Sequence, residues 1–251
     1  MANRLSKDYI NSLPIVRFEG EVITVTTEKH AEEVLRDLMQ ETGVGFDTES
    51  KPSFKKGTFY PVSLVQIAAQ DAAYLFQISK TGFTDGLVEF LENEDIKKIG
   101  VGIKTDIVKL QELRPFIPGG FVDLSPLAAE KGIIQVGVRG LTARYLRHRL
   151  PKTAQKTNWA RSELSRKQQI YAATDAWICL QIYPYLLADT TDYRQFNEDE
   201  NNNQRESGSG KNREREEERT IRLTRKTAYG KKEFTKMEKY QIAKYLKEEN
   251  Q

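Results

Sequence analysis

The sequence predicts an α/β domain in which β-strands come early and α-helices come late, followed by a charged C-terminal extension. Short apolar runs of strand length dominate residues 15–103, and apolar residues at helical spacing dominate residues 104–187. The chain is 38% hydrophobic and 30% charged, whereas globular chains average roughly 45–50% apolar and about 25% charged. Part of the chain is therefore expected to lie outside any core.

The first half of the domain is predicted to alternate strands and helices. Two short strands are expected around Gly20, within residues 15–27. Further strands are expected over residues 44–50, 62–69, 73–78 and 97–103. Apolar residues recur at helical spacing at Ala31, Val34, Leu35 and Leu38. They predict a helix that Gly43 closes, and further helices are expected over 85–93 and from about Thr105.

The second half is predicted to be mainly helical. Residues 123–150 read as mostly helix, and a long helix is expected from about Ser165 to Leu187, with Pro184 kinking or ending it late. The ordered body is expected to end near residue 190. We therefore divide the chain into a short N-terminal segment (1–14), a main domain (15–190) and an extension.

The extension is predicted to have two parts. Residues 191–219 contain almost no apolar residues, which is typical of a disordered linker. Residues 220–251 form a basic tail, with nine Lys/Arg against two Glu between Thr220 and Lys247. Phe234, Met237, Tyr240 and Tyr245 are spread along it, so it is expected to be amphipathic, and three alternatives stay open: it binds nucleic acid, docks on a protein partner or stays unstructured.

Composition excludes several classes of protein. No apolar run reaches the length of a membrane helix and the start of the chain lacks a signal-peptide stretch, so no membrane contact and a cytoplasmic location are expected. The single cysteine, Cys179, excludes an internal disulfide and reads as a small buried hydrophobe. With only two histidines as well, any metal is expected to sit on oxygen ligands.

Two carboxylates fall in one predicted strand. Asp47 and Glu49 are two positions apart, so both side chains emerge on the same face. They follow the apolar Val44 and Phe46, where two like charges repel unless a cation lies between them. The alternative is a pair of solvated acids at the end of a strand.

Three further residues stand at informative positions. Asp106 lies where a predicted strand passes into a helix, and it either takes part in a site or caps that helix together with Thr105. Tyr171 and Asp175 are four apart on the long helix and share one face. Because an unpaired buried aspartate is costly, Asp175 either is a structural partner of the tyrosine or belongs to a site.

One arrangement accounts for all of these residues. Four carboxylates, Asp47, Glu49, Asp106 and Asp175, that converge at one edge of a sheet require divalent cations, and Mg²⁺ prefers oxygen ligands. Two such ions can clamp a phosphodiester for hydrolysis. A phenol at Tyr171, one helical turn from Asp175, is then placed to orient the attacking water.

The segments GFDTES, VGIKTDIVKL and YAATDA resemble the three exonuclease motifs of the DEDD superfamily, tyrosine subclass. Over roughly residues 15–190 the chain is most similar to the Werner syndrome exonuclease domain and its relatives, and more distantly to ribonuclease D. The resemblance implies a ribonuclease-H-like fold, a mixed β-sheet flanked by α-helices. It also implies hydrolysis from a 3′ end with Mg²⁺ or Mn²⁺ and release of nucleoside 5′-monophosphates.

The resemblance assigns roles residue by residue. Asp47, Glu49, Asp106 and Asp175 match the metal ligands, and Tyr171 matches the water-positioning tyrosine. Ribonuclease-D-type members usually carry a His-Asn pair upstream of the second-motif aspartate, where this chain has residues 103–105, Ile-Lys-Thr. That departure fits the Werner-like branch and favours DNA over RNA.

The remaining expectations concern the substrate. Candidate contacts to nucleic acid are Thr48, Lys104, Trp159 and Arg161. Lys104 and Arg161 could instead be solvated surface charges, and Trp159 could instead pack beneath the last helix. Two other functions stay open: an exoribonuclease, and a nucleic-acid-binding scaffold that acts through the basic tail.

Overall fold

The computed structural model describes residues 3–53, 57, 59–151 and 157–196. Its helices and strands follow in this order: α1 (Lys7–Ser12), β1 (Glu21–Val25), α2 (Glu28–Leu38), β2 (Gly43–Ser50), β3 (Val62–Ala68), β4 (Ala72–Gln77), α3 (Ile78–Thr81), α4 (Asp85–Glu92), β5 (Lys97–Gly100), α5 (Lys104–Leu113), β6 (Phe121–Asp123), α6 (Leu124–Glu130), α7 (Val138–Leu141), the π-helix η1 (Thr142–Leu146), α8 (Arg166–Ala188) and the 3₁₀ helix η2 (Tyr193–Phe196). The disordered linker predicted over 191–219 begins too early, because residues 193–196 form η2 and Tyr193 is buried in the core. The rest of the predicted linker and the predicted basic tail, from residue 197 onward, lie outside the described residues.

The six strands form one mixed sheet in the order β1-β4-β3-β2-β5-β6. The strand β2 lies inside this sheet, antiparallel to β3 and parallel to β5. At the ends of the sheet β1 runs parallel to β4, and β6 runs parallel to β5. The predicted mixed sheet is confirmed, and β2, one of its interior strands, carries two of the candidate acids.

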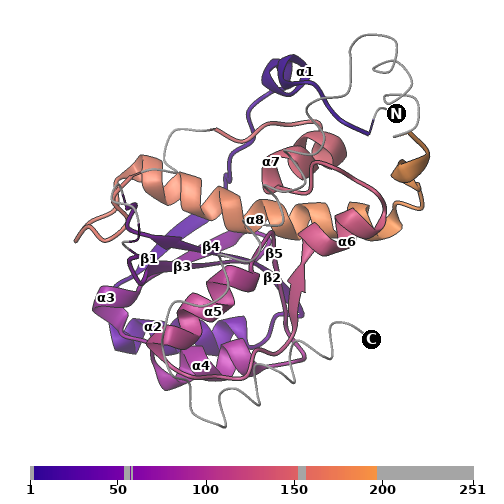
Figure 1. Cartoon of the computed structure of the whole chain (residues 1–251). Helices are drawn as coiled ribbons and strands as arrows, with labels where there is room; N and C mark the ends of the chain where they lie inside the picture. The colour runs from indigo at the N-terminus through magenta and orange to yellow at the C-terminus, as the bar shows by residue number, and fades with distance from the viewer. Residues whose placement is uncertain (1–2, 54–56, 58, 152–156, 197–251) are drawn as a thin grey trace. The chain divides into compact units, whose positions relative to one another are not determined.

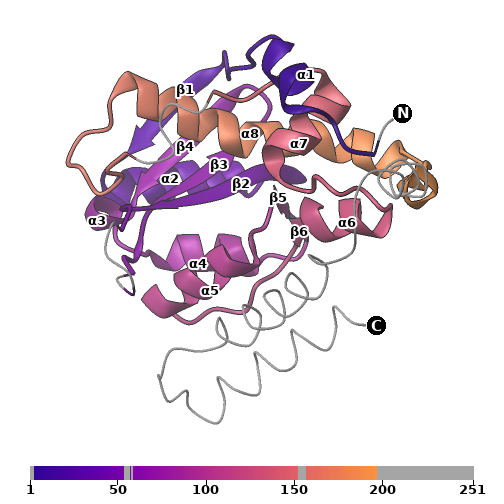
Figure 2. The same cartoon turned by 45° about the horizontal axis from the view of Figure 1, so that its top comes forward.

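Helices cover both faces of the sheet. The long helix α8 crosses one face, while α2, α4 and α5 lie on the other, as two views of the molecule show (Figures 1 and 2). In its passage α8 contacts β1 through β5. The predicted long helix is thus confirmed, and it runs on past Pro184 to end at Ala188.

The residues of β2 divide between these two faces. Phe46 packs with Ile67 of β3 in the core beneath the sheet, which α2 and α4 complete. Ala68, the partner of Gly45, packs with Ala173 and Ala176 of α8. Odd-numbered residues of β2 therefore face α8, and even-numbered residues face the other helical layer.

The start of α8 follows from its sequence. Ser165 accepts a hydrogen bond from the backbone of Gln168, and the Gln168 side chain accepts one from the Ser165 backbone. This reciprocal pair is a capping box, which fixes where the helix begins.

Two predictions for the first part of the chain are wrong. Only one strand forms within residues 15–27, because the segment before Gly20 bonds elsewhere: Ile15 makes an isolated bridge to Arg149, and the backbone N–H of Phe18 donates to Thr174 of α8 at 3.0 Å. Gly43 does not close α2, which ends at Leu38; it is the first residue of β2.

Two predictions for the middle of the chain also need correction. The strand expected over 97–103 stops at Gly100, because Gly102 takes a positive φ of 71° and turns the chain into α5. Residues 123–150 are less helical than expected: α6, α7 and η1 are short. The strand β6, parallel to β5, was not predicted, because three residues are too few to show a period.

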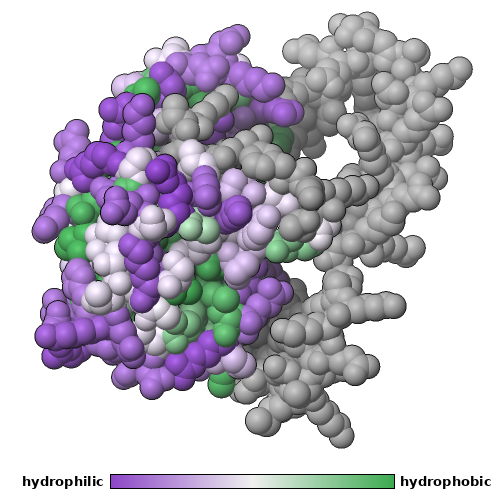
Figure 3. Space-filling view, turned by 90° about the vertical axis from the view of Figure 1, so that its left-hand side faces the viewer, coloured by the Kyte–Doolittle hydropathy of each residue, from purple (hydrophilic) through white to green (hydrophobic). Residues whose placement is uncertain are grey.

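No described helix has the length and apolar character required to cross a membrane. Seen from the side on which α3 lies, the described surface is mainly hydrophilic, with a limited hydrophobic area (Figure 3). Most large apolar side chains are instead buried between the sheet and its two helical layers.

Candidate active site

The strand β2 presents Asp47 and Glu49 to α8. In the register with β3, Asp47 pairs with Gln66 and Glu49 pairs with Leu64, whose side chain packs against α8. Because paired residues project from the same face of a sheet, both acids point toward α8. The spacing of two thus places both carboxylates together, as predicted.

The helix α8 brings Tyr171 and Asp175 to those acids. A methyl group at Gly45 would overlap the backbone carbonyl of Ala176, so the absence of a side chain there lets α8 approach β2 closely. Asp175 precedes that point of contact by one residue. Single carboxylate oxygens of Asp47, Glu49 and Asp175 all lie within 4.8 Å of one another.

Asp106 reaches this site from a different element. It lies in the first turn of α5, which begins just beyond the end of β5. One of its oxygens, Oδ1, accepts a 2.7 Å hydrogen bond from the hydroxyl of Thr48. It does not belong to the group of three acids within 4.8 Å, yet its charge raises the pKa of both Asp47 and Glu49.

Burial raises the pKa of all four acids, and the charges of neighbouring site acids add to this for Asp47 and Glu49. Burial is the largest cause of the raised pKa of Asp47, and the charges of Asp175, Asp106 and Glu49 add to it. Burial followed by the charges of Asp175 and Asp106 raises the pKa of Glu49 to about 8. Burial also raises the pKa of Asp175 to about 7 and raises that of Asp106. Without a cation, such a cluster holds protons near neutral pH.

Tyr171 is joined to the acids through its hydroxyl. The hydroxyl donates a hydrogen bond to the Asp175 carboxylate, which lowers the pKa of Asp175. Burial first, and then the charge of Asp175, raises the pKa of Tyr171, so the phenol stays protonated at every physiological pH. Its ring packs against Trp159, with the two centroids 6.0 Å apart.

Two charged residues near the site were not singled out from the sequence. Lys109 follows Asp106 by three positions on α5, and its charge lowers the pKa of both Glu49 and Asp106. Asp123 ends β6; its Oδ1 accepts hydrogen bonds from the backbone N–H groups of Gly102 and Ser125 at 2.8 and 2.9 Å. The spacing on α5 could have revealed the lysine, whereas Asp123 depends on the pairing of β6, which the sequence did not predict.

The predicted substrate contacts have mixed outcomes. Trp159 is 1% exposed and packs beneath α8, so the alternative of packing beneath the last helix is confirmed, and the expectation that a base stacks on it is wrong. Thr48 is buried and its hydroxyl donates a hydrogen bond to Asp106, and its contact with substrate stays a prediction. Lys104 and Arg161 are exposed, and their contact with phosphate stays a prediction.

The donor set fits a hard divalent cation. Carboxylate oxygens are the ligands that Mg²⁺ and Mn²⁺ prefer, and the buried thiol of Cys179 is not one of the grouped ligands. The raised pKa of Asp47 and of Glu49 is consistent with this, because a positive ion between the acids would offset both the burial and the repulsion that raise it.

Fold and site together place the chain among the DEDD-type 3′-5′ exonucleases, which are hydrolases. The chain belongs to the 3′-5′ exonuclease family, whose model matches residues 22–190.

Curated relatives agree with this family. The chain is 34% identical over 206 residues to the bifunctional 3′-5′ exonuclease/ATP-dependent helicase WRN of Mus musculus, covering 76% of this chain and 15% of that protein. It is 32% identical to a 3′-5′ exonuclease of Arabidopsis thaliana, covering 72% of this chain and 69% of that protein. Ribonuclease D of Haemophilus influenzae is 28% identical, with 61% of this chain and 38% of that protein covered. The chain thus spans only a small part of the mouse protein.

Solved structures share the fold. The exonuclease domain of Aedes aegypti Nibbler superposes with a TM-score of 0.60 at 23% identity, covering 76% of this chain and 95% of that one. Ribonuclease D of Escherichia coli superposes with a TM-score of 0.60 at 22% identity, covering 65% of this chain and 44% of that one. The predicted ribonuclease-H-like architecture is confirmed.

Proposed function

We propose that the chain hydrolyses phosphodiester bonds from the 3′ end of nucleic acid, with DNA favoured, and releases nucleoside 5′-monophosphates. Asp47, Glu49, Asp106 and Asp175 would hold two divalent ions, Mg²⁺ or Mn²⁺. The observation that carries the proposal is the convergence of acids from β2 and α8 within 4.8 Å, beside a tyrosine. When bound, such ions supply Lewis-acid activation and positive charge for the phosphoryl group.

The chain's own residues have distinct tasks. Asp47 and Glu49 are held rigidly by β2, and Asp175 is held by α8, so their oxygens are arranged before substrate arrives. Tyr171 stays protonated and is fixed by its packing on Trp159, so its hydroxyl can orient a water molecule for attack on the phosphorus.

Two observations favour DNA over RNA as the substrate. Residues 103–105, Ile-Lys-Thr, replace the His-Asn pair typical of the ribonuclease D branch. The identity is also higher to the mouse WRN protein, at 34%, than to ribonuclease D, at 28%. The ribonuclease D relatives make an exoribonuclease the second candidate.

A single assay tests both candidates. Single-stranded DNA and RNA of one sequence, labelled at the 5′ end, are incubated with the protein and Mg²⁺ or Mn²⁺, and the products are resolved by length. Stepwise shortening of DNA from the 3′ end, faster than that of RNA, is expected, together with its loss in Asp47→Ala. Faster RNA shortening would assign the exoribonuclease function. Internal cuts, or an equally active Asp47→Ala protein, would reject the proposed site.

A further inference from the structure

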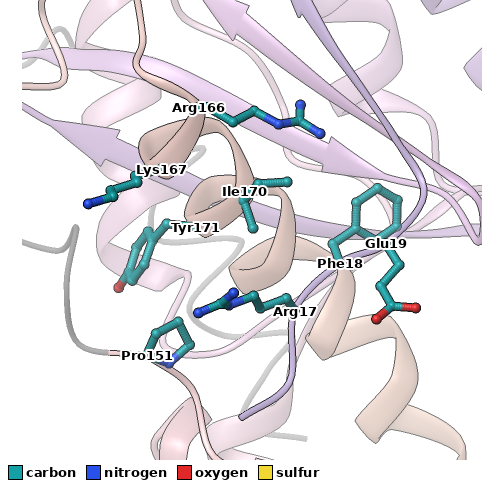
Figure 4. A pocket seen from close by; sticks show the side chains of 8 residues that line it. All are labelled: Arg17, Phe18, Glu19, Pro151, Arg166, Lys167, Ile170 and Tyr171. Carbon is teal, nitrogen blue, oxygen red and sulfur yellow. The ribbon is translucent and has the colours of Figure 1, made fainter.

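A pocket of about 560 Å³ opens beside the first two turns of α8. Its walls come from three places in the chain: the segment that leads into β1, the residue Pro151 and the start of α8. The residues that line it are Arg17, Phe18, Glu19, Pro151, Arg166, Lys167, Ile170 and Tyr171 (Figure 4).

The pocket is predominantly basic. Arg17, Arg166 and Lys167 line it against a single acid, Glu19. All three cations are exposed, and none forms an ion pair with another residue among those that the structure describes. Their charges are therefore available to an anionic ligand.

Two of the three cations lie near the tyrosine, whereas the side chain of Arg166 points away from it (Figure 4). Arg17 extends across the pocket toward Tyr171 and Pro151 (Figure 4). Lys167 lies one helical turn before Tyr171, so both occupy the same face of α8. Two cations thus flank the aromatic ring.

Tyr171 belongs both to this pocket and to the acidic site. Its ring forms part of the pocket wall, while its hydroxyl bonds to Asp175. A polymer whose terminal phosphodiester lies at the acids can therefore continue past Tyr171 into the pocket without leaving the surface of the protein.

We propose that this pocket binds the phosphodiester backbone of the substrate strand on the 5′ side of the bond that is cut. The inference rests on the proposed exonuclease function and adds a second phosphate subsite to it. Arg17 and Lys167 contact phosphate oxygens, while Phe18 and Ile170 offer an apolar floor to the attached nucleoside. Flexible exposed cations suit a ligand of any sequence, because phosphates carry no sequence information.

The test compares a short substrate with a long one. The double variant Arg17→Gln/Lys167→Gln removes two charges and keeps polar, uncharged side chains at both positions. The substrates are the p-nitrophenyl ester of thymidine 5′-monophosphate, which carries no 5′-side phosphodiester, and a 5′-labelled 12-nucleotide single strand. A matched control, Lys29→Gln/Arg36→Gln, removes two exposed charges from α2, on the opposite side of the sheet.

We expect the ratio of kcat/KM for the 12-mer to kcat/KM for the ester to fall about tenfold in the pocket variant, chiefly through KM. The slope of log KM against log salt concentration should also weaken by about one for each cation that no longer meets a phosphate. The control variant should keep the ratio and the salt dependence of the original chain.

Two results would overturn the inference. An unchanged ratio in the pocket variant would show that the pocket does not hold the strand, while the exonuclease function would stand. Equal loss on both substrates would place the two residues at the catalytic centre instead. If the unaltered chain cleaves neither substrate, the proposed function itself fails.

Discussion

The hydroxyl of Thr48 donates a 2.7 Å hydrogen bond to Asp106, joining β2 to α5 across 58 residues of sequence. Thr48 stands between Asp47 and Glu49, and its side chain leaves the strand on the opposite face from theirs. The same strand therefore presents two acids to α8 directly and holds a third acid through its intervening residue.

Replacing Thr48 with valine should weaken the site without disturbing the core. The change keeps the branched shape and removes only the hydroxyl, so Asp106 is no longer oriented by that hydrogen bond. Removal of an outer hydrogen-bond partner typically lowers metal affinity or activity by roughly 10–100-fold. Calorimetric titration with Mn²⁺ and measurement of kcat would show this loss in Thr48→Val and little of it in Thr48→Ser. Equal Mn²⁺ affinity in the valine variant and the original chain would refute an orienting role.

The stability of the metal-free protein should fall as the pH rises. The pKa of Asp175 is raised to about 7 and that of Glu49 to about 8, whereas the same groups titrate near 4 in an unfolded chain. Between pH 4 and these raised values the folded state therefore binds more protons than the unfolded state. The stability that these protons contribute is fully present below about pH 4 and is lost as the pH rises through 7 to 8. In EDTA, the Tm measured by circular dichroism should drop from pH 5 to pH 8.5.

The same linkage predicts the effect of metal. Divalent ions compete with protons for the acids, so Mn²⁺ should raise the Tm more at pH 8 than at pH 5.5. Asp175→Asn removes one of the repelling charges and should flatten the pH dependence in EDTA. A metal-free Tm that rises between pH 5 and pH 8.5 would contradict the raised pKa values.

Tyr171→Phe should separate turnover from metal binding. The phenylalanine ring can keep the contact with Trp159, so the fold should be preserved while the hydroxyl is removed. Because positioned acid-base groups contribute roughly 10²–10⁴-fold to rate, kcat should fall within that range. Mn²⁺ affinity should change only a few-fold. Unaltered kcat would show that the hydroxyl takes no part in the reaction.

Gly45→Ala should disrupt the junction of β2 and α8. Its methyl group would overlap the carbonyl of Ala176, so α8 must shift away from β2 and carry Asp175 with it. Overpacking of this kind costs about 1–3 kcal/mol, and each kcal/mol lowers the Tm by about 2–4 °C in a chain of this size. Activity should fall further than the stability loss explains. Gly137→Ala, where an added methyl meets nothing within 4 Å, is the matched control.

Local spacing made part of the site predictable. Asp47 and Glu49 are two apart in a strand, and Tyr171 and Asp175 are four apart in a helix, so each pair shares a face whatever the rest of the fold does. The strands β2, β3 and β4 and the helix α8 were predictable for the same reason, because their apolar residues recur with a clear period.

Other features depend on contacts between distant segments. The burial of Trp159 follows from its packing on Leu64, Leu75 and Tyr171, which no local pattern encodes. The pairing of Thr48 with Asp106 requires α5 to lie beside β2. The segment before Gly20 has strand composition, but its backbone bonds to residues 149 and 174 instead of joining the sheet.

The most direct test of the account is the location of Mn²⁺ in a crystal grown with a nucleoside 5′-monophosphate. Anomalous scattering identifies the ion independently of the surrounding density. The account predicts Mn²⁺ bound between the carboxylates of Asp47, Glu49 and Asp175, with the phosphate of the nucleotide beside it. Mn²⁺ bound elsewhere, with those three carboxylates contacting only one another and water, would contradict it.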